Sequence, residues 1–172
     1  MTDIAIDIPQ PEVTLIRGDT LTPEPINWLW PGWMAAGKMH ILGGQAGTGK
    51  TTIALALAAT LTIGGRWPDG SRASTGDVCI WSGEDDPTDI LVPRLRAMGA
   101  DMTRVHFVAG MTEDGKRRAF DPATDMDALE VALKGIGNVR LLIVDPIVSN
   151  GMDPFSPKRQ QSARLIVPDI SQ

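Results

Sequence analysis

The chain has 172 residues, which is enough for one compact domain with a buried core. Its net charge of −5 excludes a protein that attracts nucleic acid through overall charge, so any contact with DNA has to be local or built by assembly. The single cysteine, Cys79, excludes an internal disulfide, and its apolar neighbours indicate a buried side chain.

The N-terminal segment, residues 1–25, contains four prolines and several acidic residues, which favours an extended leader without a core of its own. Residues 1–10 lack the pattern of a signal peptide. The longest apolar run, 53–63, is too short for a membrane helix of roughly 20 residues. We therefore expect a cytoplasmic protein that is soluble and has no membrane partner.

The strongest motif follows an apolar run at 39–42 that predicts a strand. Residues 44–51 fit G-x-x-x-x-G-K-[S/T], the phosphate-binding P-loop, and an apolar helical segment follows it. Glycines let backbone N–H groups point at a phosphate, and a helix starting at Gly49 directs its positive end toward the same anion. We expect Lys50 to bind the β- and γ-phosphates of a nucleotide and Thr51 to bind the bridging Mg²⁺.

The predicted nucleotide-binding residues are consecutive in the sequence. They are Gly44, Gln45, Ala46, Gly47, Thr48, Gly49, Lys50, Thr51 and Thr52. Just before them, Trp28, Trp30 and Trp33 are too large to be left in water cheaply. Two interpretations stay open for these rings: a strap packed against the domain's edge, or a wall beside the nucleotide base or a neighbouring subunit.

The remaining elements alternate along the chain, which predicts an α/β fold with a parallel sheet. The polar stretch 111–124, which includes Lys116-Arg117-Arg118, is expected to be a mobile, solvated loop. Strands are expected at 39–42, 78–81, 105–108 and 139–145, and helices at 51–63, 87–98 and 125–135. The helix at 51–63 is apolar nearly all round and is therefore expected to be buried against the sheet.

Two carboxylates are predicted at the carboxyl edge of this sheet, where ligands of open parallel sheets bind. The apolar run 141–144 ends in Asp145, as in a Walker B strand, so we expect Asp145 to hold Mg²⁺ opposite Thr51. The alternative is that Asp145 only caps a turn before Pro146. Many P-loop enzymes carry the catalytic glutamate at the place that Pro146 takes here, so the base has to come from another strand.

Glu84 is the best candidate for this base, because it follows the strand at 78–81 and could polarise a water in line with the γ-phosphate. Asp85 is the fallback, and Asp86 is a natural N-cap for a helix that begins at Pro87. In the alternative interpretation, all three acids are present only because the helix dipole favours acidic residues at a helix start.

Four segments together resemble the RecA-like ATPases of the RepA/DnaB hexameric-helicase type, and look closest to the "AAA family" ATPases of phages, plasmids and prophages. They are 28–31, 43–52, 82–87 and 141–146, and the resemblance covers residues 26–148. It implies a three-layer α/β/α domain in which Lys50 and Thr51 bind ATP and Mg²⁺, Glu84 activates water, and Asp145 is the Walker B aspartate. Members assemble into hexameric rings and couple ATP hydrolysis to movement on single-stranded DNA.

The chain departs from this family near its end. The family continues with a sensor strand between the P-loop strand and the Walker B strand, but three prolines interrupt the stretch after Asn150. We therefore expect a leader at 1–25, an incomplete ATPase core at 26–150 and an irregular tail at 151–172. The sheet is expected to lack its central strand, which the apolar patch 165–167 would fill only in part.

Three hypotheses follow. The first is an ATPase that hydrolyses Mg-ATP as the motor domain of a helicase or DNA-replication ATPase of a mobile element. The second is a truncated nucleotide-binding module with little or no turnover, which docks into rings of full-length relatives. The third is a chain without a stable fold. His40 and His106 lack a paired ligand at metal spacing and are expected to be structural.

Overall fold

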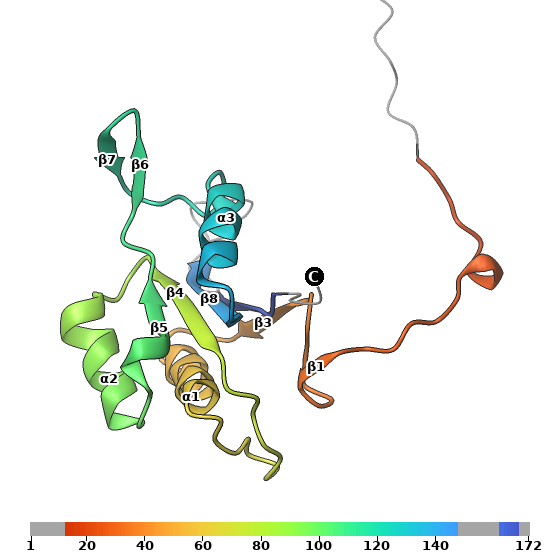
Figure 1. Cartoon of the computed structure of the whole chain (residues 1–172), viewed down its shortest axis with the longest axis horizontal. Helices are drawn as coiled ribbons and strands as arrows, with labels where there is room; N and C mark the ends of the chain where they lie inside the picture. Colours follow the sequence, from red (N-terminus) through yellow and green to blue (C-terminus); the bar gives the residue numbers. More distant parts are fainter. Residues whose placement is uncertain (1–12, 148–161, 169–172) are drawn as a thin grey trace, which may run out of the picture.

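A computed structural model describes residues 13–147 and 162–168 of the chain. A five-stranded sheet in the order β3-β9-β8-β4-β5 forms its centre (Figure 1). The strands are β3 (Met39–Gly43), β4 (Asp77–Ser82), β5 (Val105–Phe107), β8 (Val139–Ile147) and β9 (Ser162–Ile166). β4 is parallel to β5 and to β8, while β9 is antiparallel to β3 and to β8. The predicted α/β fold with a mostly parallel sheet is confirmed.

Helices cover both faces of this sheet, which makes three layers. The principal helices are α1 (Lys50–Thr62), α2 (Val92–Ala97) and α3 (Met126–Ile136). In β4, Val78 and Ile80 pack with the core under α1 and α2, whereas Cys79 between them packs with the core under α3. Successive side chains of a strand point to opposite faces, so a strand buried on both sides is apolar throughout.

The position between the P-loop strand β3 and the Walker B strand β8 is occupied by β9, and the prediction of an empty or half-filled position is wrong. Met39↔Ile166 through Gly43↔Ser162 pair on one side of β9, and Leu142↔Ile166 through Val144↔Arg164 pair on the other. Leu165 is 2% exposed and joins the core beneath α1. The strand lies within the stretch 151–172 that was expected to be irregular. Backbone pairing on both sides and burial of Leu165 stabilise it despite the prolines around it.

The helical segment after β4 differs from the single helix predicted at 87–98. It begins with a π-helical turn, η2 (Pro87–Leu91), and continues as α2. Asp86 is the N-cap, as predicted, and its carboxylate accepts a hydrogen bond from the Thr88 backbone N–H at 2.7 Å. Pro93 has no N–H to donate to the preceding turn, which explains why the regular α-helical pattern is interrupted here.

The stretch 111–124, predicted as a mobile loop, contains a β-hairpin instead. Its strands are β6 (Met111–Glu113) and β7 (Lys116–Arg118), joined by Asp114 and Gly115 with φ of 49° and 73°. An Asp-Gly pair with both residues at positive φ is typical of the tight turn that matches the twist of a hairpin. Arg118 donates to both carboxylate oxygens of Asp125, at 2.6 and 2.8 Å, and thereby ties the hairpin to the start of α3.

The N-terminal part of the described chain leaves the domain. Residues 13–27 are exposed along their length and contain one short 3-10 turn, η1 (Gly18–Thr20), as Figure 1 shows. The chain then forms a small hairpin from β1 (Trp28–Trp30) and β2 (Met34–Ala35).

A further 3-10 turn, η3 (Met102–Arg104), precedes β5. No helix among the described residues is long and apolar enough to cross a membrane.

Candidate nucleotide-binding site

The P-loop connects β3 to α1 as the sequence predicts. Gly47 and Gly49 have φ of 78° and 87°, a region that residues with a Cβ avoid, so glycine is required at both turns. A Cβ at Gly44 would lie 3.0 Å from the Thr48 hydroxyl, so a larger residue there would require the Thr48 side chain to shift. Gly49 is the N-cap of α1 and has no side chain to satisfy the first N–H groups, which leaves them directed at the loop.

Lys50 is folded over this loop. Its ammonium group donates to the carbonyl oxygens of Gly44 at 3.1 Å and Gln45 at 2.8 Å. Loop and lysine together form a cradle of N–H donors and one positive charge at a helix N-terminus, which is the arrangement that binds phosphate groups.

Thr51 and Asp145 are brought together from positions 94 residues apart in the chain. The Thr51 hydroxyl donates to the Asp145 carboxylate at 2.5 Å, and both side chains are half-buried. Asp145 lies at the carboxyl end of β8, and Thr51 lies in the first turn of α1. The two oxygens that were expected on either side of one metal ion therefore contact each other directly, and the metal-binding role of both residues stays a prediction.

These two oxygens fit a Mg²⁺ ion. Hydroxyl and carboxylate oxygens are the hard ligands that Mg²⁺ prefers, and it is typically held by one or two protein groups plus substrate phosphates. Thr51 and Asp145 would hold the ion, and Lys50 beside them would hold the phosphates. The ion supplies positive charge that neutralises phosphate oxygens during transfer.

Glu84 lies just beyond the carboxyl end of β4, on a loop that is tied down by neighbouring groups. The Gly83 N–H donates to the carbonyl oxygen of Asp145 at 2.9 Å, which links this loop to the Walker B strand. The Ser82 hydroxyl accepts from the backbone N–H groups of Glu84 and Asp85, at 3.4 and 2.9 Å. A Cβ on Gly83 would lie 2.9 Å from the Trp81 ring, so the loop is also packed against an indole.

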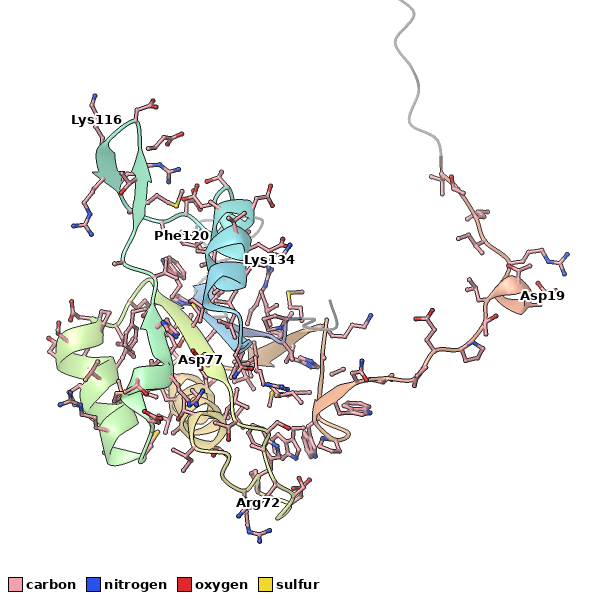
Figure 2. All side chains as sticks on the ribbon, viewed as in Figure 1. Asp19, Arg72, Asp77, Lys116, Phe120 and Lys134 are labelled. Carbon is pink, nitrogen blue, oxygen red and sulfur yellow. The ribbon has the colours of Figure 1, made fainter. Side chains whose placement is uncertain are left out.

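A single cleft of about 390 Å³ gathers most of the predicted site residues. Its lining residues are Gly47, Gly49, Lys50, Thr51, Thr52, Glu84, Asp85, Arg94 and Asp145. Gln45, Ala46 and Thr48 lie in the same loop but outside this lining set, and Gly44 contributes its carbonyl to Lys50. Figure 2 shows the side chains of all described residues on the fold.

Arg94 is the residue of this cleft that the sequence did not single out. It lies on α2, and its guanidinium donates to the hydroxyl of Thr52, the residue after the metal-binding threonine. Arg94 therefore brings a second positive charge into the cleft beside Lys50. It lies within the helix expected at 87–98, and the sequence gave no sign that this part of the helix turns toward α1.

The other candidate residues lie away from the cleft. The His106 ring lies 3.0 Å from an Asp77 carboxylate oxygen, and the His40 ring contacts the backbone of Ala35. Cys79 is buried, and burial raises the pKa of its thiol to about 11, so it stays protonated at neutral pH. Hydrogen bonds from the Thr88 hydroxyl and N–H hold the pKa of Asp86 below its usual range, as expected for a cap.

Comparisons with known proteins bear on this cleft. A family model described as an AAA domain matches residues 7–167. The ATPase BagA of Mycobacterium tuberculosis and a Mycobacterium bovis protein that is named as an ATPase are each 51% identical to the chain over 37 residues. That stretch is 22% of this chain and 11% of each relative's length. No solved structure shows significant similarity to the chain.

Proposed function

The chain belongs to the AAA domain family, and from this membership we propose that it binds Mg-ATP in the cleft and hydrolyses it to ADP and phosphate. The observation that carries the proposal is the 2.5 Å contact between the Thr51 hydroxyl and the Asp145 carboxylate. It joins the end of the P-loop to the carboxyl end of β8, which lies on the other side of β9 from the P-loop strand β3, at the edge where such sheets bind nucleotides.

Each residue has a defined part in the proposed reaction. Lys50 holds the β- and γ-phosphates, while Thr51 and Asp145 hold the metal ion. Glu84 accepts a proton from a water molecule while the oxygen of that water bonds to the γ-phosphorus. The bond between that phosphorus and the bridging oxygen breaks at the same time, and ADP leaves with the bonding electrons.

The finer proposal is that the chain is part of a motor of the RepA/DnaB helicase type that acts on single-stranded DNA of a mobile element, within a hexameric ring. Its support is the combination of the P-loop, the strand ending in Glu84 and the Walker B strand, which resembles that type. The relatives cover too little of the chain to support more than ATP use.

The first test compares Lys50→Ala with Lys38→Ala, which removes an exposed lysine from the turn before β3. Calorimetry measures ATP binding, and phosphate release measures turnover, with and without single-stranded DNA. We expect the parent and Lys38→Ala to bind and hydrolyse Mg-ATP and Lys50→Ala to lose both properties. Parental binding and turnover in Lys50→Ala would contradict the proposal.

A second candidate function is a nucleotide-binding module with little turnover. It is favoured by Pro146, which stands directly after Asp145, where many P-loop enzymes carry their catalytic glutamate. Under this candidate, ATP binds and requires Lys50, yet phosphate release stays at the background rate with DNA present. Phosphate release that single-stranded DNA stimulates would exclude the module.

A further inference from the structure

Three tryptophans form a continuous stack outside the nucleotide cleft. The Trp30 ring lies between Trp67, at a centroid distance of 5.2 Å, and Trp33, at 5.3 Å, with interplanar angles of 11° and 23°. Exposure rises along this tryptophan stack, because Trp67 is 2% exposed and Trp33 is 67% exposed. The inner ring is thus part of the core, while the outer ring ends the stack in solvent.

Hydrogen bonds fix the middle of the tryptophan stack. The Trp30 indole N–H donates to the Asp69 carboxylate at 2.9 Å, and the other Asp69 oxygen accepts from the N–H and hydroxyl of Ser71. The Trp33 backbone N–H donates to the Trp30 carbonyl at 2.9 Å, which closes the turn between β1 and β2. The Trp33 ring therefore stacks on a neighbour that is itself held in place, and this contact reduces the conformational entropy that is lost when a ligand stacks on it.

The turn that carries Trp67 is positively charged, unlike the chain as a whole. The backbones of Arg66 and Arg72 form an isolated antiparallel β-bridge across this turn, and both side chains are exposed. Asp69 is the one acidic residue of the turn 66–72, and the hairpin 28–35 contains no charged residue. Figure 2 shows Arg72 at the outer end of this turn. The two segments that build the stack thus have a net charge of +1, against −5 for the chain.

We propose that the tryptophan stack is a docking site for single-stranded nucleic acid. One base stacks on the outer ring, Trp33, and Arg66 and Arg72 contact the phosphates beside it. Aromatic rings combined with positive charge are the pairing that binds single strands without sequence preference, since every base has a π-face. The cleft-lining set contains none of the three tryptophans, so the site is separate from the nucleotide cleft. The choice of a single strand as its occupant rests on the proposed function, which acts on single-stranded DNA, but its binding test does not require ATP hydrolysis.

Fluorescence anisotropy with a labelled 15-nucleotide oligo(dT) tests this site in the full chain. We expect Trp33→Ala to weaken binding by roughly 5- to 150-fold, the range for loss of one base–aromatic stack. Arg72→Gln is expected to lower the slope of log affinity against log salt by about 0.7, the value for one phosphate contact with a single strand.

Two variants and one ligand serve as matched controls. Trp33→Phe keeps an aromatic face and is expected to retain most of the affinity. Trp28→Ala removes an exposed tryptophan of the same hairpin that is not part of the stack, and is expected to leave binding within about twofold of the parent. An oligonucleotide of the same length with abasic sites keeps the phosphates, so Trp33→Ala should not weaken its binding further.

Three outcomes would overturn the proposal: no binding of oligo(dT) by the parent, equal losses in Trp33→Ala and Trp28→Ala, or an equal effect of Trp33→Ala on the abasic ligand.

Sedimentation velocity addresses another occupant of the surface. The surface binds a second copy instead if three results occur together: the parent self-associates, Trp33→Ala abolishes this association, and oligo(dT) does not compete with it. Lys50→Ala should retain oligo(dT) binding, which separates failure here from failure of the ATPase proposal.

Discussion

The nucleotide cleft and the tryptophan stack are two exposed regions of one domain that are built in different ways. In the cleft, backbone elements place the side chains: Lys50 and Thr51 begin a helix, and Asp145 lies near the end of a strand. In the tryptophan stack, side chains place one another, since Trp30 is located by the ring of Trp67 and the carboxylate of Asp69. A site set by backbone geometry therefore leaves a motif in the sequence, whereas a site set by side-chain packing does not.

The largest effect is expected from Glu84→Gln, which keeps the size of the side chain but removes its ability to accept a proton. Phosphate release should fall by about 10²- to 10⁴-fold, the usual contribution of a general base, with ATP affinity nearly unchanged. Asp85→Asn is the matched neighbour and should reduce the rate far less. A larger loss in Asp85→Asn than in Glu84→Gln would transfer the role to the fallback residue.

Trp67→Ala tests the stack as part of the core. Replacing a buried aromatic ring by alanine costs about 3–5 kcal/mol, and Trp67 is 2% exposed. Urea unfolding should show this loss, while Trp28→Ala, at a 44% exposed position, should cost less than about 1 kcal/mol. Equal stability of the two variants would mean that the tryptophan stack contributes nothing to the core and that Trp67 does not anchor it.

Arg94→Gln examines a residue that shares features of both regions, because a side-chain contact places it in the cleft. Arg94 lines the cleft, and if its guanidinium donates to a phosphate of bound ATP, that charge-assisted hydrogen bond is worth about 1.5–3 kcal/mol, so its loss should weaken ATP binding by roughly 10- to 150-fold. Arg96→Gln, two residues along α2, removes an exposed charge that is not part of the cleft lining and serves as the control. If both variants bind ATP like the parent, Arg94 does not belong to the binding site.

The smallest effect is expected at the hairpin. Arg118 and the Asp121 backbone N–H hold the pKa of Asp125 well below its usual range, so this carboxylate contributes stability that is present above its unfolded pKa and lost as pH falls. Arg118→Gln should raise the pKa of Asp125 and lower stability at pH 7. The difference from the parent should shrink below about pH 4, close to the unfolded pKa of an aspartate. Thermal melts at pH 7 and pH 3 measure it, and a difference that grows on acidification would contradict this account.

Much of the fold and of the cleft was predictable. Short apolar runs between helical segments located the P-loop strand, β4, β5 and β8. The rule that ligands bind at the carboxyl edge of a parallel sheet predicted that Asp145 and Glu84 lie near the P-loop. The hairpin β6–β7 was missed although the Asp114-Gly115 pair was a usable signal for it. The position of β9 was not predictable, because five residues with little pattern, Ser162–Ile166, are held by pairing with strands that are distant in sequence.

The tryptophan stack shows the same limit at the level of side chains. The first three tryptophans of the chain suggested either a strap against the domain's edge or a wall beside the nucleotide base or a neighbouring subunit. No periodicity connects Trp30 to Trp67 or to Asp69, which lies 39 residues away. Arg94 lies within a predicted helix, and only the packing of α2 beside α1 brings it to Thr52. Long-range packing of this kind has no local signal in a single sequence.

The most direct test of the central claim is the dependence of ATP binding on Mg²⁺. Calorimetric titrations with Mg²⁺ and with excess chelator compare the parent with Asp145→Asn and Thr51→Val. We expect Mg²⁺ to tighten ATP binding in the parent but in neither variant, while metal-free ATP binding persists in all three. A full Mg²⁺ enhancement in Asp145→Asn would show that the metal does not lie between these two oxygens.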